Sequence, residues 1–194
     1  DSLAALRHIA HHRRHDLRLV GEDGDAIRLL RTTAQPGGQV LSIEVAGARR
    51  DLPIALPGRF QADNALVAAA LAAATGVPDA LDRLPGLLGV RGRMELAATL
   101  PNGAAVYVDY AHTPDALDRL LAALRPHTAG RLHVVFGAGG DRDPGKRPLM
   151  GAAVAARADV AIVTDDNPRT EDPAAIRDAV LAGMAAMPAA RTKA

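Results

Sequence analysis

Residues 165–169 read Asp-Asp-Asn-Pro-Arg, so two carboxylates, an amide and a guanidinium follow one another directly. A planar guanidinium binds a carboxylate through two hydrogen bonds, and a carboxylate accepts hydrogen bonds from an ammonium group. Asp166, Asn167 and Arg169 could therefore bind the charged head of an amino acid. The alternative is structural, because an Asn-Pro pair is typical of a turn before a helix.

A second polar segment, residues 137–147, reads Gly-Ala-Gly-Gly-Asp-Arg-Asp-Pro-Gly-Lys-Arg. From Gly140 to Lys146 it fits the spacing of a phosphate loop, but Arg147 stands where a Ser or Thr would hold Mg²⁺. Its two carboxylates would repel a phosphate, and its proline lacks an N–H group. A phosphate loop and a plain glycine-rich turn stay possible, but we favour a loop that presents Arg142 to a substrate.

Asp109 and His112 form a third polar segment. A carboxylate can accept hydrogen bonds from ribose hydroxyls and an imidazole can lie near a phosphate, so the pair could contact a nucleotide. The alternative interpretation is that both are polar residues at the end of a strand, ahead of a helix capped by Thr113.

These three segments each follow a short apolar run and precede a helical pattern. Thr113-Pro114 is typical of a helix start. The alternation predicts an α/β domain with a parallel, Rossmann-like sheet, in which ligands bind beyond the carboxyl ends of the strands. The strands are apolar throughout, which predicts cover on both faces. The expected strands are 105–108, 132–136 and 160–163, and the expected helices are 114–124, 148–156 and 173–186.

The first half of the chain has a different pattern. It predicts an opening helix at residues 3–15 and then short strands around turn signals at residues 21–25 and 36–38. An alanine-rich helix capped by Gln61 or Asp63 should end at Ala74, and a linker should follow at residues 89–93. The expected strands are 17–20, 26–30, 40–45 and 52–56, and a shorter helix is expected at 79–88.

Composition excludes several classes of protein. The chain of 194 residues has no cysteine, hence no disulfide, Cys-ligated zinc or thiol nucleophile. Its net charge of +1 and its four aromatic residues do not suit nucleic-acid binding. No apolar run reaches the roughly 18 residues of a membrane span. The composition fits the cytoplasm.

Four histidines, His8, His11, His12 and His15, share one face of the opening helix by their spacing. A metal site there would lack a carboxylate ligand, and arginines lie beside the histidines. We therefore favour a solvated helical face and predict no metal site.

Together these segments closely resemble the Mur ligase family. The similarity lies in long ungapped strings that extend over residues 58–187, whereas residues 1–57 carry no motif of the family. The strings are residues 58–74, 91–95, 108–117, 136–151 and 164–173.

The resemblance implies a three-domain enzyme of which this chain is an incomplete piece. Residues 1–90 would be the end of the central ATP-binding α/β domain, and residues 91–194 the C-terminal domain, truncated before its end. The implied reaction uses ATP to convert the terminal carboxylate of UDP-N-acetylmuramoyl-L-Ala-D-Glu into an acyl phosphate, which the amine of meso-diaminopimelate attacks. The implied enzyme is a cytoplasmic monomer in peptidoglycan synthesis.

By the same resemblance, the ATP-contacting positions are Asn64, Arg93, Asp109 and His112. The amino-acid pocket would contain Arg142, Asp166, Asn167 and Arg169, and Asp-Asn-Pro-Arg at 166–169 marks diaminopimelate rather than lysine. The phosphate loop and the Mg²⁺ ligands of the central domain are not in the chain, so we expect no catalysis by the chain alone.

Two departures from the family pattern affect these assignments. Gln61 stands where the family usually has Asn, and the family's Gly-Lys-Gly-His-Glu segment would lie beyond Ala194. Two other interpretations stay open, namely a binding module unrelated to ligases and a stand-alone structural or regulatory relic of one.

Overall fold

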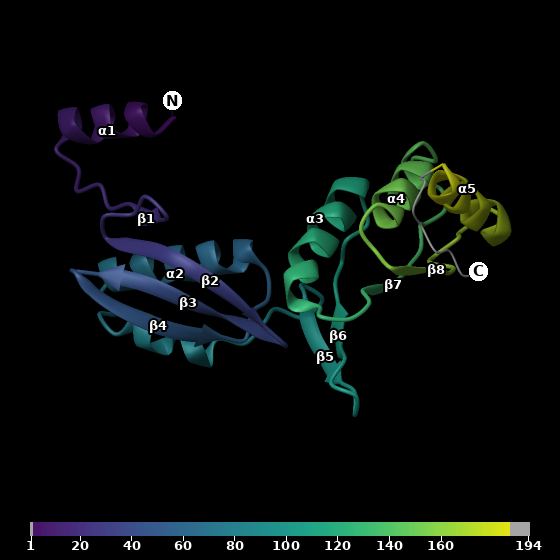
Figure 1. The fold of residues 1–194 in the computed structure, drawn as a ribbon. Coiled ribbons are helices and arrows are strands. Elements are labelled where there is room, and N and C mark those ends of the chain that lie inside the picture. The colour runs from purple at the N-terminus through teal and green to yellow at the C-terminus, as the bar shows by residue number, and fades with distance from the viewer. Residues whose placement is uncertain (1, 187–194) are drawn as a thin grey trace. The chain divides into compact units, whose positions relative to one another are not determined.

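The computed structural model describes residues 2–186 of the chain. The chain divides into two compact units, Asp1–Leu88 and Gly89–Ala194. The helices and strands of both units are drawn in Figure 1. Each unit has its own cluster of buried apolar side chains. The α/β fold class expected from the sequence is confirmed, and the assignment of each half to a particular domain of the family stays a prediction.

The first unit contains a four-stranded sheet with the strand order β1-β2-β3-β4. β1 is parallel to β2, and the remaining neighbours are antiparallel. The predicted opening helix and the strands predicted at 26–30, 40–45 and 52–56 are confirmed, although these strands are longer than predicted. The strand predicted at 17–20 is wrong in extent, because β1 contains only residues 20 and 21. The elements are α1 (Ser2–Arg13), β1 (Val20–Gly21), β2 (Ile27–Gln35), β3 (Gly38–Val45) and β4 (Ala48–Ile54).

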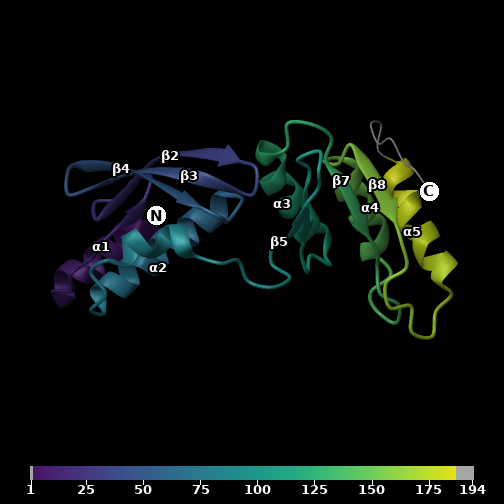
Figure 2. The same cartoon turned by 90° about the horizontal axis from the view of Figure 1, so that it is seen from below.

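Helix α2 (Arg59–Ala74) covers one face of this sheet (Figures 1 and 2). Leu41 and Ile43 of β3 and Leu66 of α2 are fully buried, so burial of alternate strand residues against the helix holds the unit together. The shorter helix predicted after α2 is confirmed, and it is a 3₁₀ helix, η1 (Ala80–Gly86). Pro85 lies inside it and cannot donate a backbone hydrogen bond.

The predicted cap of α2 is wrong. The helix begins earlier, its N-cap is Gly58, and no side chain caps it. Asp63 instead forms an ion pair with Arg59, one turn away, at 2.9 Å. The buried Gln39 fixes the chain ahead of the helix, because its Nε2 donates to the carbonyl oxygens of Leu56 and Gly58 at 2.8 and 2.7 Å.

The second unit combines a hairpin with two parallel strands. β5 (Glu95–Thr99) pairs antiparallel with β6 (Ala105–Val108), and β7 (His133–Phe136) pairs parallel with β8 (Val160–Val163). The three predicted helices and the three predicted strands are confirmed within a few residues. The helices are α3 (Pro114–Leu124), α4 (Lys146–Ala155) and α5 (Pro173–Ala185), and the short 3₁₀ helix η2 (Arg125–His127) follows α3.

The predicted pairing of the three strands needs two corrections. β6 pairs with β5, a strand that the sequence analysis missed, and within residues 2–186 it does not pair with β7 or β8. The strands are also not covered on both faces by the part of the chain described. Val108, Val135 and Ile162 are 49%, 64% and 41% exposed, because the helices pack on one side only. The strand-helix alternation therefore predicted the elements but not the pairing.

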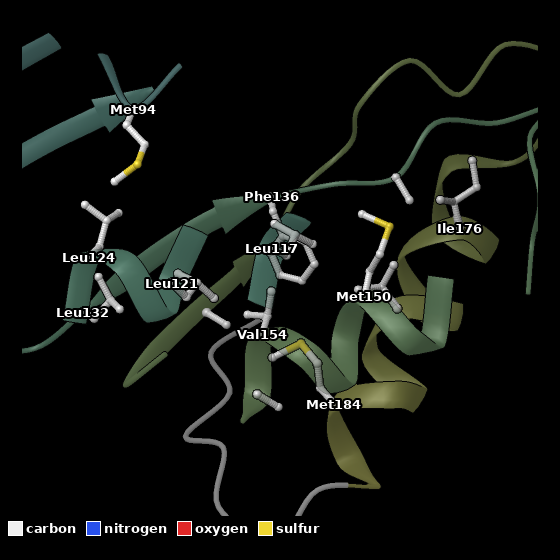
Figure 3. Close-up of a cluster of buried hydrophobic side chains, with 14 residues drawn as sticks. Met94, Leu117, Leu121, Leu124, Leu132, Phe136, Met150, Val154, Ile176 and Met184 are labelled. Atoms are coloured by element: carbon white, nitrogen blue, oxygen red, sulfur yellow. The ribbon is translucent and has the colours of Figure 1, made fainter. Parts of the chain in front are cut away.

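The core of the second unit lies between the helices and the parallel strands (Figure 3). Leu117 and Leu121 of α3, Val154 of α4 and Met184 of α5 are at most 2% exposed. Thr113 Oγ1 accepts a hydrogen bond from Ala116 N, which confirms the predicted cap of α3. In residues 2–186, no helix is long and apolar enough to span a bilayer.

The end of the second unit opposite the polar loops contains a charged junction. The carboxylate of Asp159 accepts hydrogen bonds from Leu132 N at 2.7 Å and Arg125 Nη1 at 2.6 Å. The Leu132 amide, and then Arg125, lower the pKa of Asp159 below its ordinary value. A carboxyl group with a lowered pKa stabilises the folded state above its unfolded pKa, and this contribution is lost as the pH falls through the folded pKa.

Asp159→Asn should therefore lower the free energy of unfolding at pH 7, with a difference that shrinks as the pH falls below about 4. Because Arg125 and Asp159 are 39% and 42% exposed, we expect less than about 1 kcal/mol. Both tyrosines, Tyr107 and Tyr110, lie in the second unit, and the chain has no tryptophan. Tyrosine fluorescence during urea unfolding measures the effect, and a difference that stays constant with pH would contradict this role of Asp159.

Candidate active site

Two polar loops lie against each other in the second unit. The glycine-rich loop (residues 137–145) follows β7, and the DNPR loop (residues 164–172) follows β8. Because β7 and β8 are parallel neighbours, their carboxyl ends lie at the same edge. Gly140 N donates to Asn167 O at 2.9 Å, so the loops are joined by their backbones. The sequence-based expectation that these segments meet is confirmed.

Gly140 is the point of closest approach between the loops. A Cβ atom at this position would lie 1.8 Å from the carbonyl oxygen of Pro168, which leaves no room for any side chain. The carbonyl oxygen of Gly140 also accepts a hydrogen bond from Arg169 Nη1 at 2.5 Å. Glycine is therefore required here for contact between the loops.

One residue in each loop has a left-handed backbone. Asp141 has φ 51° and Arg169 has φ 52°, which costs a residue with a side chain on the order of 1–2 kcal/mol. The conformation of Asp141 is held by its own carboxylate, which accepts from Thr170 Oγ1 at 2.7 Å. Such costly conformations cluster at functional sites.

An ion pair between a buried arginine and a glutamate whose side chain is 34% exposed lies beneath the loops. Arg147 is 5% exposed, and its Nη1 and Nη2 donate to the two carboxylate oxygens of Glu171 at 2.8 and 2.7 Å. Glu171 Oε1 accepts a further hydrogen bond from Asp141 N at 2.5 Å. The bonds from Arg147, and then the one from the Asp141 amide, lower the pKa of Glu171. Glu171 in turn raises the pKa of Arg147, so both groups are charged at neutral pH.

The predicted amino-acid residues lie on these two joined loops. Arg142, Asp166, Asn167 and Arg169 are all exposed. Among residues 2–186, the side chains of Arg142 and Asp166 have no hydrogen-bond or ion-pair partner. Arg169 uses one N–H group on Gly140, and a guanidinium has five. Two cations, a carboxylate and an amide are thus available to a ligand beside the same junction.

The phosphate-loop interpretation of residues 140–147 is disfavoured by the hydrogen bonds of the loop. A phosphate cradle needs free backbone N–H groups. Gly145 N already donates to the carboxylate of Asp143 at 2.9 Å, and Asp141 N donates to Glu171. Arg147 is buried in the ion pair rather than directed at a ligand. The geometry favours the alternative in which this loop presents Arg142.

Asp109 has a structural role in the second unit. Its carboxylate accepts from Met94 N and Ala111 N, both at 2.8 Å, and so joins the start of β5 to the end of β6. Each carboxylate oxygen can accept a second hydrogen bond. Contact with a ribose therefore stays a prediction, alongside the strand-end role that the sequence analysis left open.

Arg93 and His112 both lie close to the ring of Tyr110, which is exposed. The guanidinium of Arg93 is 5.3 Å from the ring centre of Tyr110, and the ring of His112 is 4.9 Å from it. Lys146 Nζ lies 3.5 Å from His112 O. Two basic side chains and two rings therefore gather at one place, which suits an anionic ligand with an aromatic or sugar part. Tyr110 and Lys146 were not predicted as site residues.

The remaining predicted nucleotide residue is Asn64, which is exposed on α2 of the first unit. Within residues 2–186, no three or more His, Cys, Asp or Glu side chains could hold a metal ion together. His8, His11 and His12 lie on α1 and His15 lies beyond its end, so the predicted face of four histidines on one helix is wrong for His15. All four are exposed, and the rings of His8 and His12 are 4.3 Å apart.

Residues 92–194 match the family described as "Mur ligase, glutamate ligase domain". The chain belongs to the Mur ligase family. The family resemblance stated from the sequence motifs is thereby confirmed.

Two relatives of this Mur ligase chain carry the same name, UDP-N-acetylmuramoyl-L-alanyl-D-glutamate--2,6-diaminopimelate ligase. The protein from Caulobacter vibrioides is 57% identical over 164 residues, which is 84% of this chain and 34% of that protein. The protein from Zymomonas mobilis is 51% identical over 187 residues, which is 94% of this chain and 38% of that protein. The chain thus spans little more than a third of the length of these relatives.

Solved structures agree with the family assignment. A structure of a ligase with the same name shares 35% identity with a TM-score of 0.62, over 82% of this Mur ligase chain and 32% of that one. A folylpolyglutamate synthase from Thermotoga maritima has a TM-score of 0.71 over 98% of this chain and 44% of that one, at 21% identity, which shows the fold alone.

Proposed function

We propose that this chain is part of an ATP-dependent ligase that joins meso-diaminopimelate to UDP-N-acetylmuramoyl-L-Ala-D-Glu, and that its two joined loops bind the diaminopimelate. The observation that carries the proposal is the junction of the glycine-rich and DNPR loops at Gly140. It joins the loops that carry Arg142, Asp166 and Arg169, and within residues 2–186 the side chains of Arg142 and Asp166 have no partner. The names of the relatives support the same substrate.

In this proposal the loops bind the two charged groups at the distal end of diaminopimelate. Diaminopimelate carries, at its distal end, a carboxylate and an ammonium group on one carbon. Arg169, with Arg142 nearby, holds the carboxylate through charge-assisted hydrogen bonds, and Asp166 accepts from the ammonium. Fixing the distal end would orient the other amine for attack on the activated carboxylate of the UDP-linked peptide.

The cluster of Arg93, Tyr110, His112 and Lys146 fits part of ATP in the same proposal. Arg93 and Lys146 supply charge for phosphate oxygens, and the exposed ring of Tyr110 offers a stacking surface. His112 Nδ1 lies 2.9 Å from the Tyr110 carbonyl oxygen, so its Nε2 is left for a ligand. Asp109 would contact the ribose, and Asn64 of the first unit stays a predicted nucleotide contact. ATP supplies the phosphoryl group that activates the carboxylate.

The Mg²⁺ that such a reaction needs is not assigned to residues of this chain, because no suitable cluster occurs in residues 2–186. The proposal places the ligase in the cytoplasm, where ATP and UDP-linked precursors are available, and treats it as a monomer.

A chimeric ligase tests the function directly. In this chimera the matching segment of the Caulobacter vibrioides ligase is replaced by this chain. We expect ATP-dependent ligation of meso-diaminopimelate to the UDP-linked dipeptide, measured by product chromatography and ADP release. The unmodified Caulobacter enzyme is the control. A correctly folded chimera that ligated other amino acids but not diaminopimelate would show that the proposed function is wrong.

The chain by itself should not hydrolyse ATP or form product. Stabilisation of a transferred phosphoryl group needs a phosphate cradle and Mg²⁺ ligands. The N–H groups of residues 141 and 145 are already bonded to carboxylates. Coupled detection of ADP from the purified chain checks this. Turnover that persisted through independent preparations and disappeared in Lys146→Ala would overturn our interpretation of residues 140–147.

A further inference from the structure

A closed ring of hydrogen bonds connects the two loops below the exposed arginines. Arg147 binds both oxygens of Glu171, and Glu171 accepts from the backbone of Asp141. The Asp141 carboxylate returns to the DNPR loop by accepting from Thr170 Oγ1 at 2.7 Å and from Thr170 N at 3.3 Å. The ring thus joins residue 141 of one loop to residues 170 and 171 of the other.

The ring ends one residue away from each arginine of the proposed pocket. Asp141 precedes Arg142, and Thr170 follows Arg169. Asp141 and Arg169 are also the loop residues with positive φ, so the backbone next to each arginine is held in a conformation that it would not adopt freely. A change in the ring would therefore change the distance and direction between the two guanidinium groups.

Stability alone explains the buried arginine poorly. A buried ion pair is often no more stabilising than apolar residues of similar size, because removing charge from water is costly. Here that cost falls mainly on Arg147, since the Glu171 side chain is 34% exposed. Arg147 Nε is buried and, among the residues described, has no hydrogen-bond partner, which adds to this cost. The same unit contains a second two-pronged ion pair, between Arg157 and Asp118, with distances of 2.7 and 3.0 Å. Asp118 lies on α3 and Arg157 follows α4, and their side chains are 41% and 44% exposed, so this pair differs from the one with the buried Arg147.

We infer that Arg147 and Glu171 are positioning residues for amino-acid recognition, which set the spacing of Arg142 and Arg169 without touching the ligand. The inference rests on the proposed function of the two loops. Arg147 is buried, and the hydrogen bonds of its Nη1 and Nη2 go to Glu171 and, at 3.5 Å, to the carbonyl oxygen of Gly139, so it acts through its neighbours. Glu171 is the shared acceptor that transmits its position to the glycine-rich loop.

The test compares Arg147→Met and Glu171→Gln in the chimeric ligase, with Arg157→Met as the matched control. Arg147→Met should raise KM for meso-diaminopimelate about 10- to 100-fold, since misplacement of a binding group by about 1 Å has effects of this size. KM for ATP and for the UDP-linked dipeptide should stay within about twofold, since the substitution removes no side chain that is proposed to bind either of them. Arg157→Met should change none of the three.

Glu171→Gln keeps the shape of the side chain and an oxygen for Asp141 N, so it tests the inference even if Arg147→Met does not fold. It should raise KM for diaminopimelate in the same direction. In the 194-residue chain itself, outside the chimera, Glu171→Gln should also speed hydrogen exchange of the Asp141 amide and leave exchange of the amides of α3 unchanged. This second measurement does not depend on activity.

Three outcomes are distinguishable. Loss of active enzyme with an unchanged KM for diaminopimelate would mean that the ring only stabilises the fold, and the inference would be wrong. An equal rise in KM for all three substrates would contradict it too. If the unsubstituted chimera failed to use diaminopimelate, the proposed function would fail instead, and faster exchange at Asp141 in Glu171→Gln would still support the coupling of the loops.

Discussion

Replacing Arg169 with alanine in the chimeric ligase should lower kcat/KM for meso-diaminopimelate by roughly 2–5 kcal/mol in transition-state free energy, the usual cost of removing one partner of a charged pair that the bound ligand would bury. The change for lysine should be much smaller. Lysine lacks the distal carboxylate, so in the unsubstituted enzyme it leaves the guanidinium of Arg169 without its partner. A site built around a polar group can reject an analogue that lacks it by up to about 10⁴–10⁵-fold.

Arg169 also holds the loops together, so its replacement tests a structural role against a role in binding the substrate. Its Nη1 donates to Gly140 O, so removal of the side chain could change the shape of the pocket. If shape were its only role, Arg169→Ala would impair both amino acids equally. Arg169→Lys should rescue poorly, because an ammonium group cannot make a planar two-pronged contact.

Arg177→Ala is a matched control for this experiment. Arg177 is another arginine bound to the DNPR loop, through Asp165, but it comes from α5. Its removal should change selectivity little. A loss of selectivity as large as that of Arg169→Ala would indicate that any arginine contact to this loop suffices.

Gly183→Ala should destabilise the second unit by about 3 kcal/mol or more, at the upper end of the usual cost of overpacking. Gly183 lies where α5 crosses α4. A Cβ atom there would lie 1.9 Å from the carbonyl oxygen of Pro148 and 2.5 Å from its Cα. These are backbone atoms, so the helices would have to move apart. The gain in helix propensity, about 1 kcal/mol, is too small to offset this.

Urea unfolding followed by tyrosine fluorescence measures this effect, because both tyrosines lie in the second unit. Gly130→Ala is the control, since a Cβ atom there meets nothing within 4 Å. It should be neutral or stabilise by about 0.4–1 kcal/mol. Equal unfolding midpoints for Gly183→Ala and the unsubstituted chain would show that the helix crossing adapts easily.

Local sequence signals predicted the elements of the second unit well. Thr113-Pro114 predicted the start of α3, because the threonine caps the helix and proline suits its first turn. The apolar runs at β7 and β8 predicted that the following loops meet, because parallel neighbours end at the same edge. The loops that carry Arg142 and Arg169 could be placed together on that basis.

Features that depend on residues distant in the sequence could not be predicted in the same way. The strand β5 contains Leu96, Ala97 and Ala98 rather than a run of β-branched residues, and its existence depends on pairing with β6. The Asn102-Gly103 turn between them was the one available signal for a hairpin.

The start of α2 and the Arg147–Glu171 ion pair also depend on partners that are distant in the sequence. Asp63 has a side chain that is typical of a helix cap. The helix α2 nevertheless begins earlier, because the buried Gln39 of β3 binds the carbonyl oxygen of Gly58, the N-cap. The sequence placed Arg147 in a loop motif. Its burial against Glu171, 24 residues further on, depends on the folded unit.

The most direct test of the central claim is a crystal structure of the chimeric ligase with meso-diaminopimelate bound. We predict that the distal carboxylate lies within hydrogen-bonding distance of the Arg169 guanidinium, with Arg142 nearby and the distal ammonium on Asp166. The Arg147–Glu171 pair should lie intact beneath them. A structure in which diaminopimelate is bound with its distal carboxylate away from both loops would contradict the account.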